Sequence, residues 1–323
     1  MPDWWRFRNY LSALFKYHRH LDGLKREGER WQSHYPTSIP DLGETGFLSI
    51  LPLVDWHASA PGFKTEMGVS YLVKTDHLTV LFDVGQNAKK EDPSPLLHNM
   101  AKLGVDLASV DVIVISHRHY DHTGGHVWSR KATFSLGNCQ TNLSEKRIFV
   151  PTSLSYPGTN PVVAVDAIWL APGVATTGVI GRQLFIGWVD EQALAVNVRN
   201  KGIVLIVGCG HQKLDRLLQR TERLFSLPIY GIIGGLHYPL PKGRVTWLGI
   251  NTQRRFASGG GLLTPLSRIE IEADLSLLRL RRDKLGAVGL SGHDSSDEVI
   301  EWFRQSFGPA YRNVRVGEEI VIS

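Results

Sequence analysis

Four residues of the kinds that bind metal ions lie within one stretch of six: His117, His119, Asp121 and His122. They follow the apolar run 110–115 (VDVIVI), which is typical of a strand buried on both faces. A lone histidine would indicate a structural role. In this spacing, however, His117 and His119 can point at one ion while Asp121 and His122 face a second. Imidazole nitrogen and carboxylate oxygen suit zinc first, with manganese and iron as alternatives. The pattern predicts two divalent metal ions beside one loop.

The strand at 110–115 must position this loop, and further short elements surround it in the sequence. Strands are expected at 69–73, 78–82, 193–198, 203–207, 230–233 and 287–290, and helices at 95–103, 214–224 and 271–282. A last helix follows in SSDEVIEWFRQSF, where Ser295 and Glu298 have the spacing of a capping box.

Residues 241–268 interrupt this rhythm, because they are rich in glycine, serine and arginine. We interpret them as an inserted flexible loop. One alternative is a mobile lid that closes over an anionic substrate, with Ser258–Gly261 as its hinge. Its positive charge and aromatic surface would come from Arg244, Arg254, Arg255, Arg268 and Trp247. The other alternative is an ordinary surface loop or subunit contact.

The first forty residues differ from the rest and predict a basic amphipathic helix. Its apolar positions recur at three- and four-residue spacing, at Trp4, Phe7, Leu11, Leu14 and His18. We therefore divide the chain into an amino-terminal helical extension at 1–40 and a main domain at 41–323. The extension fits packing against the parent domain or a sister subunit, with a homodimer left open. Weak attachment to a membrane surface is the alternative.

Composition sets outer limits on the function. The 323 residues have a hydrophobic fraction of 42%, no run of eighteen apolar residues and no amino-terminal secretory signal pattern. Two cysteines, Cys139 and Cys209, cannot form a disulfide framework, so a cytoplasmic protein is expected. The net charge of +5 permits a small anionic substrate. No zinc finger or RNA-binding signature is present, so no nucleic-acid partner is expected.

The H-x-H-x-D-H motif, together with LFDVG at 81–85, resembles the metallo-β-lactamase superfamily. This resemblance implies an α/β protein with a four-layer α/β/β/α sandwich, here with the amino-terminal helical extension added. It places the metals at one edge, between two sheets. It also implies that Asp83 is a buried carboxylate that braces the metal loop and does not bind metal itself.

A closer resemblance is to the branch that contains the archaeal dihydropterin–ribofuranosylaminobenzene-phosphate synthases. The segments EMGVSYLV, LFDVGQN, LLHNMAKLGVDL, SHRHYDHTGG, IVGCGH, GGLH, SGHDSS, FGPAY and VGEEI carry it, over about 45–240 and 270–323. Where the wider superfamily has a histidine after Pro-Gly, this chain has Val174. The branch instead implies that His211 and His293 are metal ligands. Cys209 is either a further ligand or a buried structural cysteine.

The resemblance completes two ligand sets: His117, His119 and His211 for one ion, and Asp121, His122 and His293 for the other. Asp121 and His237 are the predicted catalytic residues. His237 is expected to be a substrate-facing acid or phosphate contact, against a structural hydrogen-bonding role.

The expected function is a dinuclear metal-dependent hydrolase that cleaves a small anionic ester, a phosphoester first, by a metal-bridged hydroxide. Asp121 would orient this hydroxide, and His237 would assist the leaving group or grip the oxyanion. The alternatives are a synthase-like transferase, a lactone or thioester hydrolase, and a ligand sensor without turnover.

Overall fold

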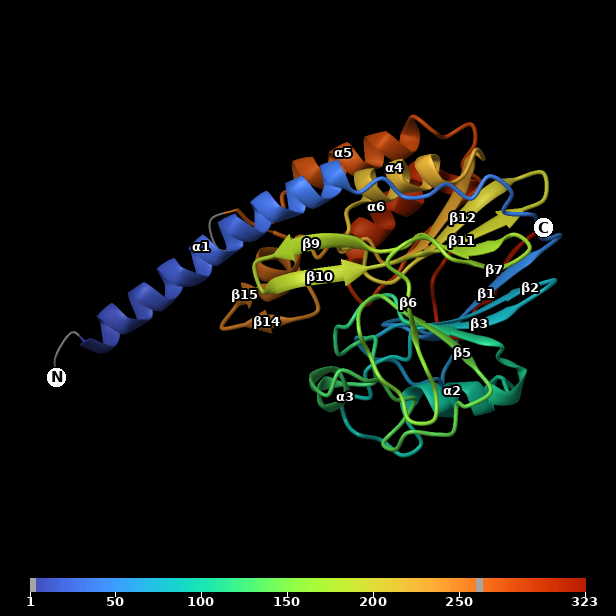
Figure 1. Cartoon of the computed structure of the whole chain (residues 1–323), viewed down its shortest axis with the longest axis horizontal. Coiled ribbons are helices and arrows are strands. Elements are labelled where there is room, and N and C mark those ends of the chain that lie inside the picture. Colours follow the sequence, from blue (N-terminus) through green and yellow to red (C-terminus); the bar gives the residue numbers. More distant parts are fainter. Residues whose placement is uncertain (1–3, 260–263) are drawn as a thin grey trace.

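Two mixed β-sheets form the centre of the molecule (Figure 1). The computed structural model describes residues 4–259 and 264–323, with side chains from Lys16 onward. The first sheet has the strand order β17-β1-β2-β3-β4-β5-β6, and the second has the order β16-β13-β12-β11-β8-β7. The strands of the first sheet are β1 (Leu48–Val54), β2 (Ser70–Thr75), β3 (Thr79–Phe82), β4 (Val112–Val114), β5 (Arg147–Val150), β6 (Val162–Val163) and β17 (Ile320–Ile322). Those of the second are β7 (Trp169–Ala171), β8 (Val174–Thr176), β11 (Leu194–Val198), β12 (Gly202–Val207), β13 (Ile229–Gly234) and β16 (Ala287–Leu290).

Helices cover the outer face of each sheet. The α2 helix (Pro95–Lys102) packs Leu96 and Met100 on the first sheet. The α4 (Leu214–Leu224), α5 (Arg268–Arg279) and α6 (Asp297–Phe307) helices share one apolar cluster with the second sheet. In β12, Val204 and Ile206 face the first sheet whereas Leu205 faces the helices, so both faces of this strand are buried. These four layers confirm the predicted α/β/β/α fold class.

The parallel strands explain where the candidate ligands gather. In the first sheet β3, β4 and β5 are parallel, and in the second β12, β13 and β16 are parallel. Because carboxyl ends of parallel strands meet at one edge, the loops that follow them lie side by side. His117 follows β4, His211 follows β12, His237 follows β13 and His293 follows β16.

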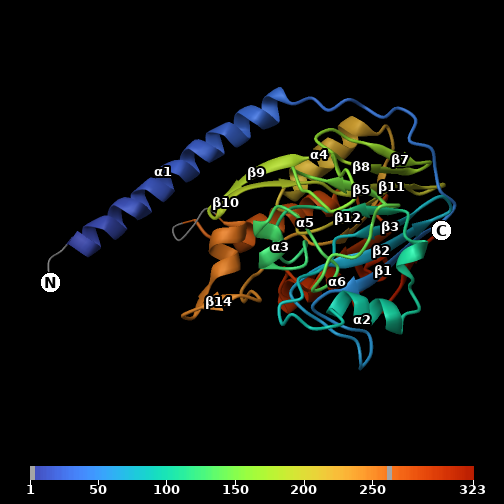
Figure 2. The same ribbon diagram turned by 60° about the horizontal axis from the view of Figure 1, so that its bottom comes forward.

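The later turns of the amino-terminal α1 helix (Trp4–Ser33) contact the domain (Figures 1 and 2). Buried Glu27 accepts the backbone N–H of Gln183 (2.6 Å), at the hairpin of β9 (Ile180–Leu184) and β10 (Gly187–Glu191), and pairs with Arg216 (2.6 Å). The earlier half extends away from the body in both views. In the predicted apolar stripe, the side chains of Trp4, Phe7, Leu11 and Leu14 lie outside those described, whereas His18 is exposed. No helix within the described residues is both long and apolar enough to cross a membrane.

The described part of the inserted segment contains regular structure, which the prediction of a flexible loop did not include. Between 241 and 259 it forms β14 (Thr246–Trp247), β15 (Ile250–Asn251) and a π-helix, η2 (Gln253–Ser258). Side-chain hydrogen bonds override its glycine-rich composition: Asn251 donates to Pro239 O (2.7 Å), and Gln253 Oε1 accepts Arg244 N (2.6 Å). Gly260 and Gly261 of the proposed hinge lie outside the described residues.

Two helix starts also differ from the prediction. The N-cap of α6 is Ser296, which accepts Val299 N, while the hydroxyl of Ser295 donates to Asp294. The capping box belongs to α5, between Ser267 and Glu270. The remaining short elements are α3 (His126–Arg130) and two 3₁₀ turns, η1 (Leu107–Ser109) and η3 (Gly308–Ala310).

Candidate metal centre

Three histidines from two sheets form the first ligand group. His117 Nε2 lies 3.0 Å from His119 Nδ1, and His211 Nε2 lies 3.2 Å from the same atom. All three donor atoms lie within 4.8 Å of one another, as three ligands of one ion must. The structure therefore brings together the three residues that the sequence and the resemblance assign to one metal.

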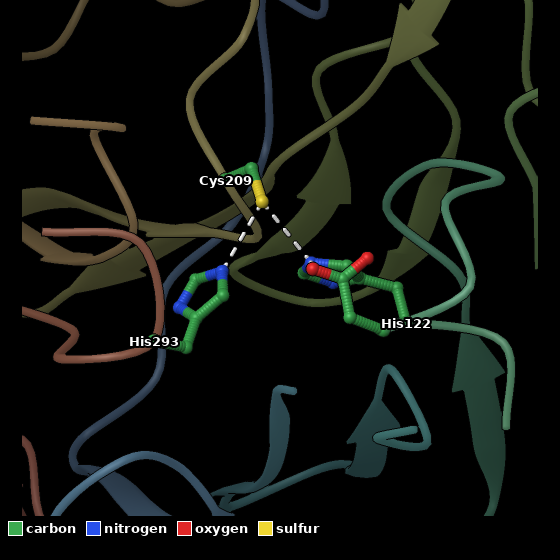
Figure 3. Close-up of side chains that lie close together, drawn as sticks. His122, Cys209 and His293 are labelled. Atoms are coloured by element: carbon green, nitrogen blue, oxygen red, sulfur yellow. Dashed lines mark hydrogen bonds and ion pairs between the residues drawn. The ribbon is translucent and has the colours of Figure 1, made fainter. Parts of the chain in front are cut away.

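The second group contains Asp121, His122, Cys209 and His293. Figure 3 shows the Cys209 thiol between two imidazoles, 3.1 Å from Nε2 of His122 and 3.1 Å from Nε2 of His293. Asp121 Oδ2 lies 4.0 Å from His122 Nε2. The ring centroids of His117 and His122 are 4.1 Å apart, so the two groups adjoin. The position of Cys209 favours the ligand alternative over a purely structural cysteine.

Asp83 braces the loop in the way that the resemblance implies. Its Oδ1 accepts the Ser116 N–H (2.7 Å), while its Oδ2 accepts the Ser116 hydroxyl (2.6 Å) and His122 Nδ1 (2.7 Å). Since the Ser116 proton goes to the carboxylate, Ser116 Oγ accepts from His117 Nδ1 at 2.9 Å. Both histidines thereby keep the proton on Nδ1 and turn Nε2 toward the centre.

A second carboxylate does the same for His293 from the other side. Asp55 is fully buried and accepts the Ser291 hydroxyl at Oδ2 and the Gly292 N–H at Oδ1. Ser291 Oγ lies 2.6 Å from His293 Nδ1 and accepts a hydrogen bond from it. Burial raises the pKa of Asp55 to about 6, although the Ser291 hydroxyl and backbone N–H groups oppose this.

Glu191 holds the loop that carries Cys209 and His211. Its buried carboxylate accepts three consecutive backbone N–H groups, from Cys209 (2.9 Å), Gly210 (2.9 Å) and His211 (2.7 Å). The loop also needs a glycine at 208, because a Cβ there would lie 2.2 Å from Ser116 Oγ. The loops of the two sheets therefore meet at Gly208 and Ser116.

His237 lies next to the first group, with its ring centroid 4.5 Å from that of His211. Its backbone has φ of 55°, and Asp294 Oδ2 holds it by accepting the His237 N–H (2.9 Å). Its Nδ1 lies 2.5 Å from Ser258 Oγ in the inserted segment. Burial lowers the pKa of His237 to about 3, which favours the neutral ring over the protonated one.

The electrostatics of the first group fit a cation. Burial and the neighbouring histidines hold the pKa of His117 and of His211 well below the usual value, and burial lowers that of His119 to about 4. Neutral imidazoles then point nitrogen lone pairs at one another across the centre. A divalent cation satisfies all three lone pairs at once, which hydrogen bonds among three rings cannot do.

Exposure and cavities show where a substrate can enter. His119 and Asp121 are half-buried while the other ligands are buried, so the centre opens toward these two residues. A cavity of about 290 Å³ adjoins His237 and is also lined by Ser258, Tyr238 and Asp274. A larger cavity, of about 730 Å³ beside Tyr230 and Arg281, is lined by none of the ligands.

Several functional neighbours escaped the sequence analysis. Glu191, Asp55, Ser291, Ser258 and Arg182 support the ligands, but none lies in the H-x-H-x-D-H motif. Ser116 also supports a ligand, and its position directly before His117 could have indicated this role. Arg244, predicted to line a lid, instead bonds Gly292 O (2.7 Å) and pairs with Asp297 (2.7 Å).

Comparison with known proteins agrees with this geometry. Residues 64–134 match the family model of the metallo-beta-lactamase superfamily. A 7,8-dihydropterin-6-methyl-4-(beta-D-ribofuranosyl)-aminobenzene-5'-phosphate synthase from Methanocaldococcus jannaschii is 25% identical over 250 residues, which are 62% of this chain and 80% of that protein. The crystal structure of a metal-dependent hydrolase of the β-lactamase superfamily gives a TM-score of 0.57 at 22% identity, over 85% of this chain and 99% of the other. A metallo-beta-lactamase fold protein from Bacillus subtilis gives 0.47 at 11% identity, over 84% and 99%.

Fold and motif therefore define a metallo-β-lactamase fold protein. More particularly, residues 64–134 match the model of the metallo-beta-lactamase superfamily, and the H-x-H-x-D-H motif falls within these residues.

Proposed function

We propose that this chain is a dinuclear metal-dependent hydrolase that acts on a small anionic ester, with a phosphoester as the first candidate. The observation that carries the proposal is the pair of adjoining ligand groups, one of three histidines and one of Asp121, His122, Cys209 and His293. When bound there, two divalent ions would lower the pKa of water and polarise a phosphoryl or carbonyl oxygen. Zinc is the preferred ion because the donors are imidazole, thiolate and carboxylate.

The residues of the chain have separate tasks in this proposal. Asp121 is half-buried at the opening of the centre, so its carboxylate can contact both an ion and the incoming substrate. Two buried carboxylates keep Nε2 of the ligand histidines directed inward. Asp83 acts directly and through Ser116, and Asp55 acts through Ser291. This preorganisation is what lets a metal site act without rearranging in each turnover.

Metal stoichiometry tests the dinuclear part. Protein stripped with a chelator and reloaded with Zn²⁺, Mn²⁺ or Fe²⁺ should hold two equivalents by elemental analysis. His117→Ala should lose the first ion and His122→Ala the second, while His77→Ala, on an exposed turn, keeps both. At most one equivalent in the unmodified chain would refute the dinuclear centre.

Substrate class is tested separately, on the reloaded protein. A panel of phosphomonoesters, phosphodiesters, lactones and thioesters should give its highest kcat/KM with a phosphoester. A transferase is the second candidate, since a relative at 25% identity is named as a synthase. Water incorporation separates the two, because a hydrolase places ¹⁸O from labelled water in its product and a transferase does not. Hydrolysis confined to lactones or thioesters would reject the phosphoester.

A further inference from the structure

Ser258, at the end of the π-helix in the inserted segment, makes three short polar contacts. Its Oγ lies 2.5 Å from His237 Nδ1, 3.2 Å from the carbonyl oxygen of His237 and 3.2 Å from that of Gln253. Ser258 is 5% exposed and His237 is 6% exposed, so both groups are almost fully buried. The inserted segment therefore places the Ser258 hydroxyl against His237, beside the metal centre.

These contacts favour one position for the proton on the His237 ring. A carbonyl oxygen only accepts, and a serine hydroxyl has one proton to donate. When that proton is directed at either carbonyl oxygen, Ser258 Oγ offers a lone pair to His237 Nδ1. His237 is then the Nδ1–H tautomer, and its Nε2 carries a free lone pair.

The same arrangement orients two histidines of the ligand groups. Ser116 donates to Asp83 and accepts from His117 Nδ1, while Ser291 donates to Asp55 and accepts from His293 Nδ1. In both cases Nε2 is the atom that faces the other ligands. Ser258 repeats this arrangement, with backbone carbonyls in place of the carboxylate.

We propose that His237 is a further ligand of the metal centre and that Ser258 is its positioning residue. Donor atoms of His237, Cys209 and His211 lie within 4.8 Å of one another, and this group shares Cys209 with the second ligand group and His211 with the first. The inference rests on the proposed metal centre, but it replaces the role of His237 as an acid. It also assigns the inserted segment a role in positioning a metal ligand, which differs from the role of a lid over the substrate.

Arg182 of β9 ties this arrangement to the first ligand group. Its Nη1 donates to the carbonyl oxygen of His211 and its Nη2 to that of Ser258, each at 2.8 Å. One rigid guanidinium therefore fixes the spacing between the His211 loop and the inserted segment. Arg182 thereby holds the His211 loop beside the residue that contacts His237, and the two rings lie 4.5 Å apart between centroids.

Nitrogen NMR of the full chain, labelled with ¹⁵N-histidine, tests the proposal. His237→Gln assigns the His237 signals by their loss. The metal-free chain should show the proton on Nδ1 of His237, and Zn²⁺ alone should move its Nε2 resonance while Nδ1–H remains. Ser258→Ala should give mixed tautomers and weaken Zn²⁺ binding about ten-fold in chelator competition, within the range for residues that orient a ligand.

Ser258→Thr keeps the hydroxyl and should restore both the tautomer and the affinity. Ser49→Ala removes another buried serine hydroxyl, in the first sheet, and should change neither. A proton on Nε2 in the unmodified chain, or a His237 resonance that two bound Zn²⁺ ions leave unmoved, would overturn this inference alone. A chain that binds no Zn²⁺ would overturn the proposed function with it. The unmodified spectrum decides the tautomer even where a variant fails to fold.

Discussion

Asp83 Oδ2 lies 2.7 Å from His122 Nδ1, and both side chains are fully buried. The same oxygen accepts the Ser116 hydroxyl, so one carboxylate orients the rings of His117 and His122 on both sides of the metal centre. Burial lowers the pKa of His122, but Asp83 and Asp121 outweigh this and raise it to about 9. This hydrogen bond therefore fixes the orientation of the His122 ring and stabilises its protonated form, so that an ion binding at Nε2 must displace a proton.

Asp83→Asn is expected to weaken metal binding by roughly 10- to 100-fold, because an amide cannot accept from Ser116 and His122 as a carboxylate does. Asparagine tolerates the φ of 61° at this position, so the backbone is retained. Chelator competition measures the affinity. Asp111→Asn, which changes an exposed acceptor of Thr79 N, is the control. Equal affinity in Asp83→Asn and the unmodified chain would contradict the bracing role.

Cys209→Ser should lower the affinity of the second ion by more than the roughly 10- to 100-fold typical of residues that only orient ligands. The reason is the position of its sulfur, 3.1 Å from Nε2 of both His122 and His293. Co²⁺-loaded protein should show a sulfur-to-cobalt charge-transfer band that this variant loses. Cys139→Ser, at an exposed cysteine, should keep the band. A band that persists without Cys209 would exclude it as a ligand.

Glu27→Ala should lower the free energy of unfolding by about 2–4 kcal/mol, because it leaves the Gln183 N–H and the Arg216 guanidinium without their buried partner. Urea unfolding measures this loss. Glu29→Ala, two residues on and paired with Lys25 at an exposed site, should change stability by at most about 0.5 kcal/mol. Similar losses in the two variants would show that α1 is not anchored through Glu27.

The pH dependence of stability should change in Asp274→Asn. Burial raises the pKa of Asp274 from 3.8 to about 6, although the Tyr238 hydroxyl, which donates to it at 2.8 Å, opposes the shift. A raised folded-state pKa gives stability that is fully present below pH 3.8 and is lost as the pH rises through about 6.

Asparagine cannot ionise. The free energy of unfolding of Asp274→Asn, relative to that of the unmodified chain, should therefore rise by about 1–2 kcal/mol between pH 4 and pH 8. Denaturant unfolding at both pH values measures the gain. Asp283→Asn, in the exposed turn after α5, controls for loss of a surface charge. If the variant were stabilised more at pH 4 than at pH 8, the pKa of Asp274 would not be raised in the folded state.

The ligand loop could be predicted from the sequence because its four ligands are local. His117, His119, Asp121 and His122 follow one apolar strand, so spacing alone indicated their chemistry. His211 and His293 are brought to the loop by strands of the other sheet, and only the resemblance pointed to them. Ligands from separate strands leave no pattern of spacing that a single sequence can show.

The supporting groups were missed for a related physical reason. Glu191 works through three backbone N–H groups of residues 209–211, and such contacts depend on the folded path of the chain. The inserted segment was misjudged from its composition, since the glycines and arginines suggested mobility. In the structure Gln253, Asn251 and Arg254 hydrogen-bond the segment internally and to its flanks, so tertiary contacts override local composition.

The ligands come from two different sheets, and this has a consequence for the stability of the protein in the cell. His117 and His122 follow β4 of one sheet, whereas Cys209 and His293 follow β12 and β16 of the other. Ions bound between them would fasten the two halves of the sandwich as a removable cross-link. Each ion at a free concentration a hundred times its Kd adds about 2.7 kcal/mol to the folded state. When metal becomes scarce, this chain would unfold and be degraded more readily, so its abundance would follow the metal supply without any dedicated regulator.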